Sequence, residues 1–262
     1  AVIDYEKCTN CGACEASCKF DAILVEREEK KKKDLSAYKG VWVFAEQRRE
    51  KLVFTTLELL GEGRKLADKL NQEISAILIG NNVAELTSTL IASGADKVFL
   101  IDDPVFKHYS TDAYVKVMID LINEYKPSVV LVGATNNGRD MSARISCRVG
   151  TGLTADCTSL EIDEETGLVA WTRPAFGGNI MAVILCPNHR PQMGTVRPSV
   201  FKKPEPEHSR KGEVIKIQAN VKPEEIRTRF IETIELEDAI SCNLEEAEII
   251  VSGGRGMGKK EN

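Results

Sequence analysis

The sequence lacks several features that would assign whole classes of function. No apolar run approaches the roughly 18 residues of a membrane-spanning helix, and residues 1–25 carry cysteines and charges where a signal peptide would be apolar. Basic residues do not predominate, since 35 Lys and Arg stand against 40 Asp and Glu. The chain therefore offers no broad positive field for nucleic acid. We expect a cytoplasmic protein with no membrane span and no nucleic-acid partner.

Hydrolytic chemistry and histidine-based metal sites also lack support. The three histidines, His108, His189 and His208, show no metal-ligand spacing. No Ser-His-acid set or nucleophile elbow is present. The sequence therefore assigns no catalytic residue.

Cysteine, in contrast, is concentrated in one place. Four of the 8 cysteines fall within CTNCGACEASC, where Cys8, Cys11, Cys14 and Cys18 match C-x2-C-x2-C-x3-C. Zinc favours two C-x2-C pairs separated by a longer loop, and a redox dithiol needs only one pair. The run is typical of a 4Fe-4S cluster, although Lys19 stands where a proline usually follows the fourth cysteine.

The segment 1–25 resembles the second half of a two-cluster ferredoxin domain, with a strand, the cysteine loop, a short helix and a return strand near 23–25. In such domains the fourth cysteine of each run binds the cluster of the other run. Two interpretations are open. The preferred one is that an upstream segment is absent from this chain, and the other is that Cys18 serves as the fourth ligand of a single cluster.

A charged stretch, EREEKKKKD, indicates a solvated linker over residues 26–38. After it, strand and helix patterns alternate, which predicts a doubly wound, mostly parallel α/β domain. The expected strands are 41–46, 74–80, 97–102 and 128–133, and the expected helices are 55–70, 82–94, 110–125 and one from Asn137.

From about residue 156 the pattern changes to shorter strands, which we expect to be antiparallel or mixed. These strands are expected at 157–163, 168–173, 180–186 and 193–198. A last strand pair is expected at 213–219 and 227–236.

Three stretches carry a family resemblance: GATNNGRDMSARISCRVGTGLTADCTSLEID, TRPAFGGNIMAVILCPNHRPQMGTVRPSVF and EAEIIVSGGRGMGKKEN. They resemble the alpha subunit of electron-transfer flavoproteins, more narrowly the electron-bifurcating type with an N-terminal ferredoxin-like extension. The resemblance implies an extension at 1–25, a nucleotide-hydrolase-like α/β domain at 39–245 and the start of an FAD-binding domain at 246–262. It also implies that the chain is truncated at both ends.

The glycine-rich end has two interpretations on its own residues. Glycines after a strand permit positive φ and close approach of backbone amides to a phosphate, but such an end is often only a flexible tail. A phosphate loop of a nucleotide hydrolase is disfavoured, because Lys260 stands where a hydroxyl residue would hold magnesium. The resemblance implies that Gly253, Gly254, Arg255 and Gly256 bind the FAD of the alpha subunit.

Arg173 is the other candidate cofactor residue. Without the family, a strand-end arginine that pairs with a carboxylate is the simpler interpretation. The resemblance implies that Arg173 projects onto the FAD of the beta subunit, where a fixed cation stabilises the reduced, anionic flavin. Gly177 and Gly178 would then form the turn that aims it, and Arg197 is a weaker candidate for the same interface.

The resemblance implies an electron-transfer subunit of an oxidoreductase complex rather than an enzyme by itself. Electrons from NADH would pass via FAD to a flavin-dependent dehydrogenase, of acyl-CoA or hydroxy-acid type, and to ferredoxin. The beta subunit would complete a heterodimer. The alternative is a non-bifurcating carrier or scaffold in which the cluster segment only holds partners together.

Overall fold

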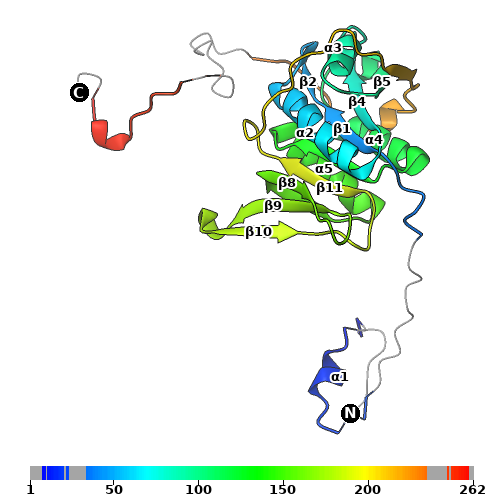
Figure 1. Ribbon diagram of the computed structural model, residues 1–262, viewed down its shortest axis with the longest axis vertical. Coiled ribbons are helices and arrows are strands. Elements are labelled where there is room, and N and C mark those ends of the chain that lie inside the picture. Colours follow the sequence, from blue (N-terminus) through cyan, green and yellow to red (C-terminus); the bar gives the residue numbers. More distant parts are fainter. Residues whose placement is uncertain are drawn as a thin grey trace. The chain divides into compact units, whose positions relative to one another are not determined.

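The structure is a computed structural model that describes most of the chain (Figure 1). The described residues are 8–9, 11–20, 22–23, 34–234, 247 and 249–259. Two compact units divide the chain, residues 1–33 and residues 34–262, and each is described by itself. Their boundary falls inside the linker expected at 26–38, while the domain bounds expected from the sequence stay predictions.

The second unit is built on a seven-stranded sheet in which all neighbouring strands are parallel. From edge to edge its strands are β12 (Glu213–Lys216), β5 (Lys97–Asp102), β4 (Ile74–Gly80), β1 (Val41–Ala45), β6 (Val129–Gly133), β11 (Gln192–Val196) and β7 (Leu153–Cys157). Parallel sheets have both faces covered, so their strands read as apolar runs. Every residue of β1, β4 and β6 is buried accordingly. The expected α/β fold is confirmed.

Helices cover both faces of this sheet (Figure 1). They are α2 (Phe54–Leu70), α3 (Leu86–Ala92), α4 (Thr111–Tyr125) and α5 (Asn136–Val149). Val41 and Val43 lie in one apolar cluster with residues of α2 and α3, whereas Trp42 and Phe44 lie in another with residues of α4 and α5. Because successive strand side chains point to opposite faces, these two helix pairs lie on opposite sides of the sheet.

A second, antiparallel sheet extends from the end of the large one (Figure 1). Its strands are β8 (Ser159–Ile162), β9 (Val169–Ala175) and β10 (Ile180–Ile184), and we call it the ribbon. Trp171 of β9 anchors the ribbon, since its buried ring lies against the backbone of Gly194 in β11. A Cβ atom at Gly194 would lie 2.2 Å from that ring, so only glycine fits there.

The short strands expected from about residue 156 are mixed. β8, β9 and β10 are antiparallel, whereas β11, at the strand expected at 193–198, lies between β6 and β7 and runs parallel to both. One expectation about the second half of the chain is wrong, because the strand pair expected at 213–219 and 227–236 does not form. β12 pairs with β5 instead, and residues 227–234 contain no strand, while 235–236 lie outside the described residues. Which strand a segment pairs with is a long-range choice that local apolar pattern does not encode.

Within the described ranges, every helix is too short or too polar to span a bilayer.

Candidate functional site

The cysteine run surrounds one short helix, α1 (Ala13–Ser17). Gly12 precedes it in a left-handed conformation, with φ of 79°, which a residue with a side chain rarely adopts. Cys8, Cys11 and Cys14 are exposed and Cys18 is half-buried. The loop therefore keeps its thiols at the surface, where an inorganic cluster has access to them.

Backbone amides already stabilise a negative sulfur at Cys18. Its Sγ accepts a hydrogen bond from the backbone N–H of Ala22 at 3.4 Å. Hydrogen bonds from the backbone of Phe20 and Ala22 hold the pKa of the Cys18 thiol below its usual value. Iron–sulfur clusters need thiolates, and N–H···S bonds tune their potential, so this donor set fits a 4Fe-4S cluster.

The four sulfur atoms are not gathered into one ligand set. Among the described residues, no group of three or more His, Cys, Asp or Glu side chains is arranged to hold a metal ion. The residue types and the N–H···S bonds therefore support the cluster, whereas ligation by Cys8, Cys11, Cys14 and Cys18 stays a prediction. The strands expected at the start of the chain and at 24–25 lie outside the described residues.

Arg173 lies in β9, opposite Ala182 of β10. Its Nε donates weakly to the carbonyl of Pro174 at 3.4 Å, and among the described residues its terminal nitrogens have no hydrogen-bond or ion-pair partner. A simple carboxylate pair is therefore not what this arginine forms within the described chain. It keeps planar donors available for an anionic group, which fits a flavin held by another subunit.

The ribbon around Arg173 presents an apolar surface. Its exposed side chains are Phe176, Ile180, Met181 and Val183, with Phe176 at 83% and Val183 at 62% of their full exposure. The turn between β9 and β10 contains Gly177 and Gly178, both with positive φ, as expected for a tight turn. Contiguous exposed apolar side chains mark a protein contact surface. In the register of β9 and β10, Arg173 lies on the same face as Ala182 and Ile180, whereas Met181 and Val183 lie on the other face.

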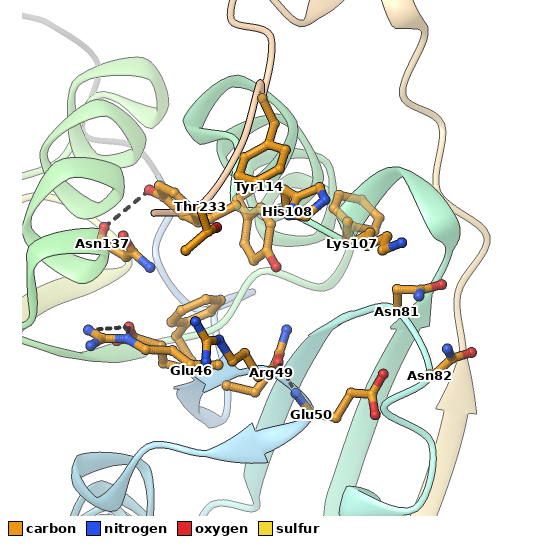
Figure 2. A pocket seen from close by; sticks show the side chains of 16 residues that line it. Glu46, Arg49, Glu50, Asn81, Asn82, Lys107, His108, Tyr114, Asn137 and Thr233 are labelled. Carbon is orange, nitrogen blue, oxygen red and sulfur yellow. Dashed lines mark hydrogen bonds and ion pairs between the residues drawn. The ribbon is translucent and has the colours of Figure 1, made fainter. Parts of the chain in front are cut away.

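A crevice with a volume of about 790 Å³ lies at the carboxyl ends of β1 and β4 (Figure 2). It lies at the switch point of the sheet, where β4 and β6 flank β1 on opposite sides, a frequent ligand position in α/β folds. Figure 2 shows Glu46, Arg49 and Glu50 on one wall and Lys107 and His108 on the opposite one.

Glu46 occupies the position at the switch point where an anionic ligand would be expected. The buried Glu46 accepts a hydrogen bond from the Thr135 hydroxyl at 2.5 Å and from Arg48 Nη2 at 3.1 Å. Thr135 is the N-cap of α5, and its hydroxyl also accepts from the N–H of Gly138. Helix N-termini favour anions, and here the chain supplies its own carboxylate. We therefore assign no nucleotide to this crevice.

Sequence reasoning missed Glu46, although it stands at the end of the apolar run VWVFAE, where an acidic residue is conspicuous. The sequence pattern predicts the next helix from Asn137, and α5 starts one residue earlier, at Asn136, after the Thr135 cap. Arg139 and Asp140, in the first turns of α5, pair with Asp156 and Arg144. They contribute to structure there rather than to a ligand site.

The glycine-rich end, residues 249–259, is exposed throughout and contains one short 3-10 turn, η4 (Arg255–Met257). Gly258 has positive φ, whereas Gly253, Gly254 and Gly256 do not. A Cβ atom at Gly254 or Gly256 would meet nothing within 4 Å. No cradle for a phosphate is formed within these described residues, so FAD binding by Gly253, Gly254, Arg255 and Gly256 stays a prediction.

Comparison with known families identifies the class of protein. The family model described as "4Fe-4S binding domain" matches residues 1–24, and the one described as "Electron transfer flavoprotein domain" matches residues 41–222. Together they define an electron-transfer protein with an iron–sulfur segment. The chain belongs to the electron transfer flavoprotein family and is an alpha-type electron-transfer subunit. The family implies FAD, and its alpha subunits act with a beta subunit and a dehydrogenase.

Individual relatives support this assignment. The chain is 53% identical to the "Electron transfer flavoprotein subunit alpha" of Megasphaera elsdenii over 87% of this chain and 67% of that protein. It is 44% identical to the "Acryloyl-CoA reductase electron transfer subunit beta" of Anaerotignum propionicum, over 86% and 68%. It is 40% identical to the "Lactate dehydrogenase (NAD(+),ferredoxin) subunit LctC" of Acetobacterium woodii, over 95% and 59%. The chain thus spans about two thirds of these relatives or less.

Proposed function

We propose that this chain is the electron-transfer subunit of a flavin-based electron-bifurcating complex, in which electrons from NADH pass via FAD to a flavin-dependent dehydrogenase and to ferredoxin. One observation carries the proposal. The Acetobacterium woodii relative matches 95% of the chain, so its match must extend into the cysteine run, and its name pairs NAD(+) with ferredoxin. We place the complex in the cytoplasm, because exposed thiols that bind a cluster need a reducing compartment.

The parts of the chain take separate roles in this proposal. FAD supplies the chemistry that converts a two-electron donor into single-electron transfers. Arg173 would place a positive charge on the FAD of the beta subunit, and the ribbon's apolar surface would bind that subunit. Gly253, Gly254, Arg255 and Gly256 would hold the phosphates of the second FAD. Cys8, Cys11, Cys14 and Cys18 would hold the cluster that passes electrons to ferredoxin.

The cluster's role is tested by Cys11→Ala in the full-length, FAD-loaded complex. We expect ferredoxin reduction to be lost while NADH oxidation by an artificial acceptor continues, because only the path through the cluster is interrupted. Cys147→Ala, an exposed cysteine on α5, is the matched control and should change neither rate. Unchanged ferredoxin reduction in Cys11→Ala, with the iron content of the complex reduced, would refute the relay.

The second candidate function is a non-bifurcating carrier or scaffold, favoured by the observation that the four thiols are not gathered into a ligand set. Arg173→Ala separates the two functions. A bifurcating subunit should lose coupled ferredoxin reduction while the beta subunit still binds, because the cation tunes the flavin. A scaffold should show only weaker binding of the beta subunit, with unchanged rates once the subunits are saturated.

A further inference from the structure

The end of β7 has an unusual backbone. Its pairing with β11 shifts in register between Gly194 and Val196, and Asp156 at the shift has φ of 60°. Left-handed backbone is unfavourable for most residues, and bulges of this kind redirect a side chain, often beside functional sites. The Asp156 N–H donates to the hydroxyl of the buried Thr195 at 3.0 Å. The fold therefore fixes the direction of one carboxylate.

Cys157 and Thr158, which follow Asp156, form backbone hydrogen bonds to the segments that carry Arg197 and Arg173. The carbonyl of Cys157 accepts from the backbone N–H of Arg197 at 3.0 Å. The N–H of Thr158 donates to the carbonyl of Thr172, the neighbour of Arg173, at 2.8 Å. The backbones of Arg173 and Arg197 therefore both lie near the point where β7 passes into the ribbon, which we call the corner.

Positive charge exceeds negative charge at this corner. Asp156 accepts from Arg139 Nη2 at 2.8 Å and lies 4.0 Å from Arg197 Nη2. Burial raises the pKa of the Cys157 thiol to about 12, and the charge of nearby Arg173 opposes that rise. One carboxylate, Asp156, thus faces the guanidinium groups of Arg139 and Arg197, and Arg173 adds a third positive charge near Cys157, so the corner attracts an anion.

The ion pair between Asp156 and Arg197 is longer than the one between Asp156 and Arg139. Asp156 is 28% exposed, and the side chains of Arg139 and Arg197 are about half-exposed. Arg139 pairs closely and orients the carboxylate, whereas the 4.0 Å contact holds Arg197 without saturating its donors. A guanidinium held this way is positioned and still able to bind a second group.

We propose that Asp156 is a positioning residue that holds Arg197 beside Arg173, so that both guanidinium groups face the FAD of the beta subunit. Arg197 is then a second cation for the reduced, negatively charged flavin, and Arg139 acts only through Asp156. This inference rests on the proposed function, because it requires the ribbon to face that flavin.

The test is Asp156→Asn in the full-length subunit bound to its FAD-loaded beta subunit. The measurement is the ratio of reduced to oxidised beta-subunit FAD at a fixed applied potential. If Asp156 positions Arg197, the ratio falls about fivefold, because Arg197 is no longer held at the flavin. A rise would mean that Asp156 acts only as a nearby negative charge, and no change would mean that it serves the fold alone. Either result overturns the proposal.

Further variants keep the test decisive if Asp156→Asn folds poorly. Arg197→Gln should lower the ratio as much as Asp156→Asn does, and Arg197→Lys should restore part of it. Arg173→Gln separates this inference from the proposed function. If Arg173→Gln lowers the ratio and Arg197→Gln does not, the inference fails alone. If neither changes it, the ribbon does not face the flavin and the proposed role of Arg173 fails too.

Discussion

The large parallel sheet and the antiparallel ribbon use similar apolar strands in opposite ways. Every residue of β4, sequence ISAILIG, is buried between helices. In β10, sequence IMAVI, no residue is buried, and Ile180, Met181 and Val183 are exposed. The difference lies in what covers them. Helices follow the parallel strands in sequence and close both faces, but nothing in the described chain covers the outer face of β10. Apolar content alone therefore does not distinguish a buried core strand from a strand with an exposed apolar face.

The largest expected effect on stability concerns the contact between Trp171 of the ribbon and Gly194 of the large sheet. Gly194→Val should destabilise the α/β domain by about 3 kcal/mol or more, because the new side chain would overlap the ring of Trp171. The midpoint of urea unfolding measures the effect. Gly152→Ala is the matched control, since its Cβ would meet only Cys186 Sγ at 3.9 Å. If both variants unfold alike, the ribbon is not anchored through Gly194.

A second, smaller loss of stability is expected inside the large sheet. Glu46→Ala should lower the free energy of unfolding by about 2 kcal/mol, because it leaves the buried Thr135 hydroxyl without its acceptor, whereas the exposed Arg48 can turn to water. Glu161→Ala, an exposed carboxylate on β8, should change it by less than about 0.5 kcal/mol. A neutral Glu46→Ala would show that the carboxylate does not hold β1 to α5.

A substitution on the exposed face of the ribbon should change the affinity for the beta subunit rather than the stability of the chain. Val183→Asp on β10 should leave unfolding nearly unchanged and weaken binding of the beta subunit by about tenfold or more, because it places a charge in an apolar contact. Titration calorimetry with the beta subunit measures the affinity. Val214→Asp on β12, another exposed valine, should leave the affinity intact. Equal effects of the two variants would remove the ribbon as the contact surface.

The smallest effect concerns a stretch that packs on the large sheet's helices without regular structure. Arg227 donates to Asp112 of α4 from its backbone N–H and from its guanidinium, with a shortest distance of 2.6 Å. These hydrogen bonds lower the pKa of Asp112 to about 2 from an ordinary 3.8. The stabilisation is therefore complete above pH 3.8 and is lost as the pH falls toward 2.

Arg227→Gln should consequently reduce stability slightly at pH 6, and its difference from the unchanged protein should vanish near pH 2. Urea unfolding at several pH values measures this. Arg229→Gln, a neighbouring exposed arginine, provides the control. A difference that persisted at pH 2 would mean that Arg227 acts by packing rather than by charge.

Much of the fold could be predicted from local pattern. Apolar runs bounded by turns located β1, β4, β5 and β6, and helical spacing located α2 and α4 to within a residue or two. The place of β11 in the parallel sheet was not predicted, because this buried strand has only five residues and lies far in sequence from both neighbours. The role of residues 227–234 was missed because the ion pair of Arg227 with Asp112 and the stacking of Phe230 on His108, rather than a strand partner, hold them.

The candidate site residues also fall into those that a local pattern predicts and those that only the tertiary structure marks. Spacing alone predicts Cys8, Cys11, Cys14 and Cys18 as cluster ligands, because ligand geometry around a cluster constrains a short contiguous loop. Arg173 came from a resemblance, and the structure adds that its terminal nitrogens have no partner among the described residues. No local signal marked Asp156, since its proposed role depends on a bulge and on two arginines, Arg139 and Arg197, from separate parts of the chain.

By itself, then, the sequence determined the class of fold and predicted the cluster ligands, because both depend on residues close together in the chain. Only the tertiary structure decided the order of the seven strands, the exposure of the ribbon and the charge balance around Asp156. These depend on which distant segments come into contact, and that follows from the burial of the whole sheet rather than from the pattern of any one segment.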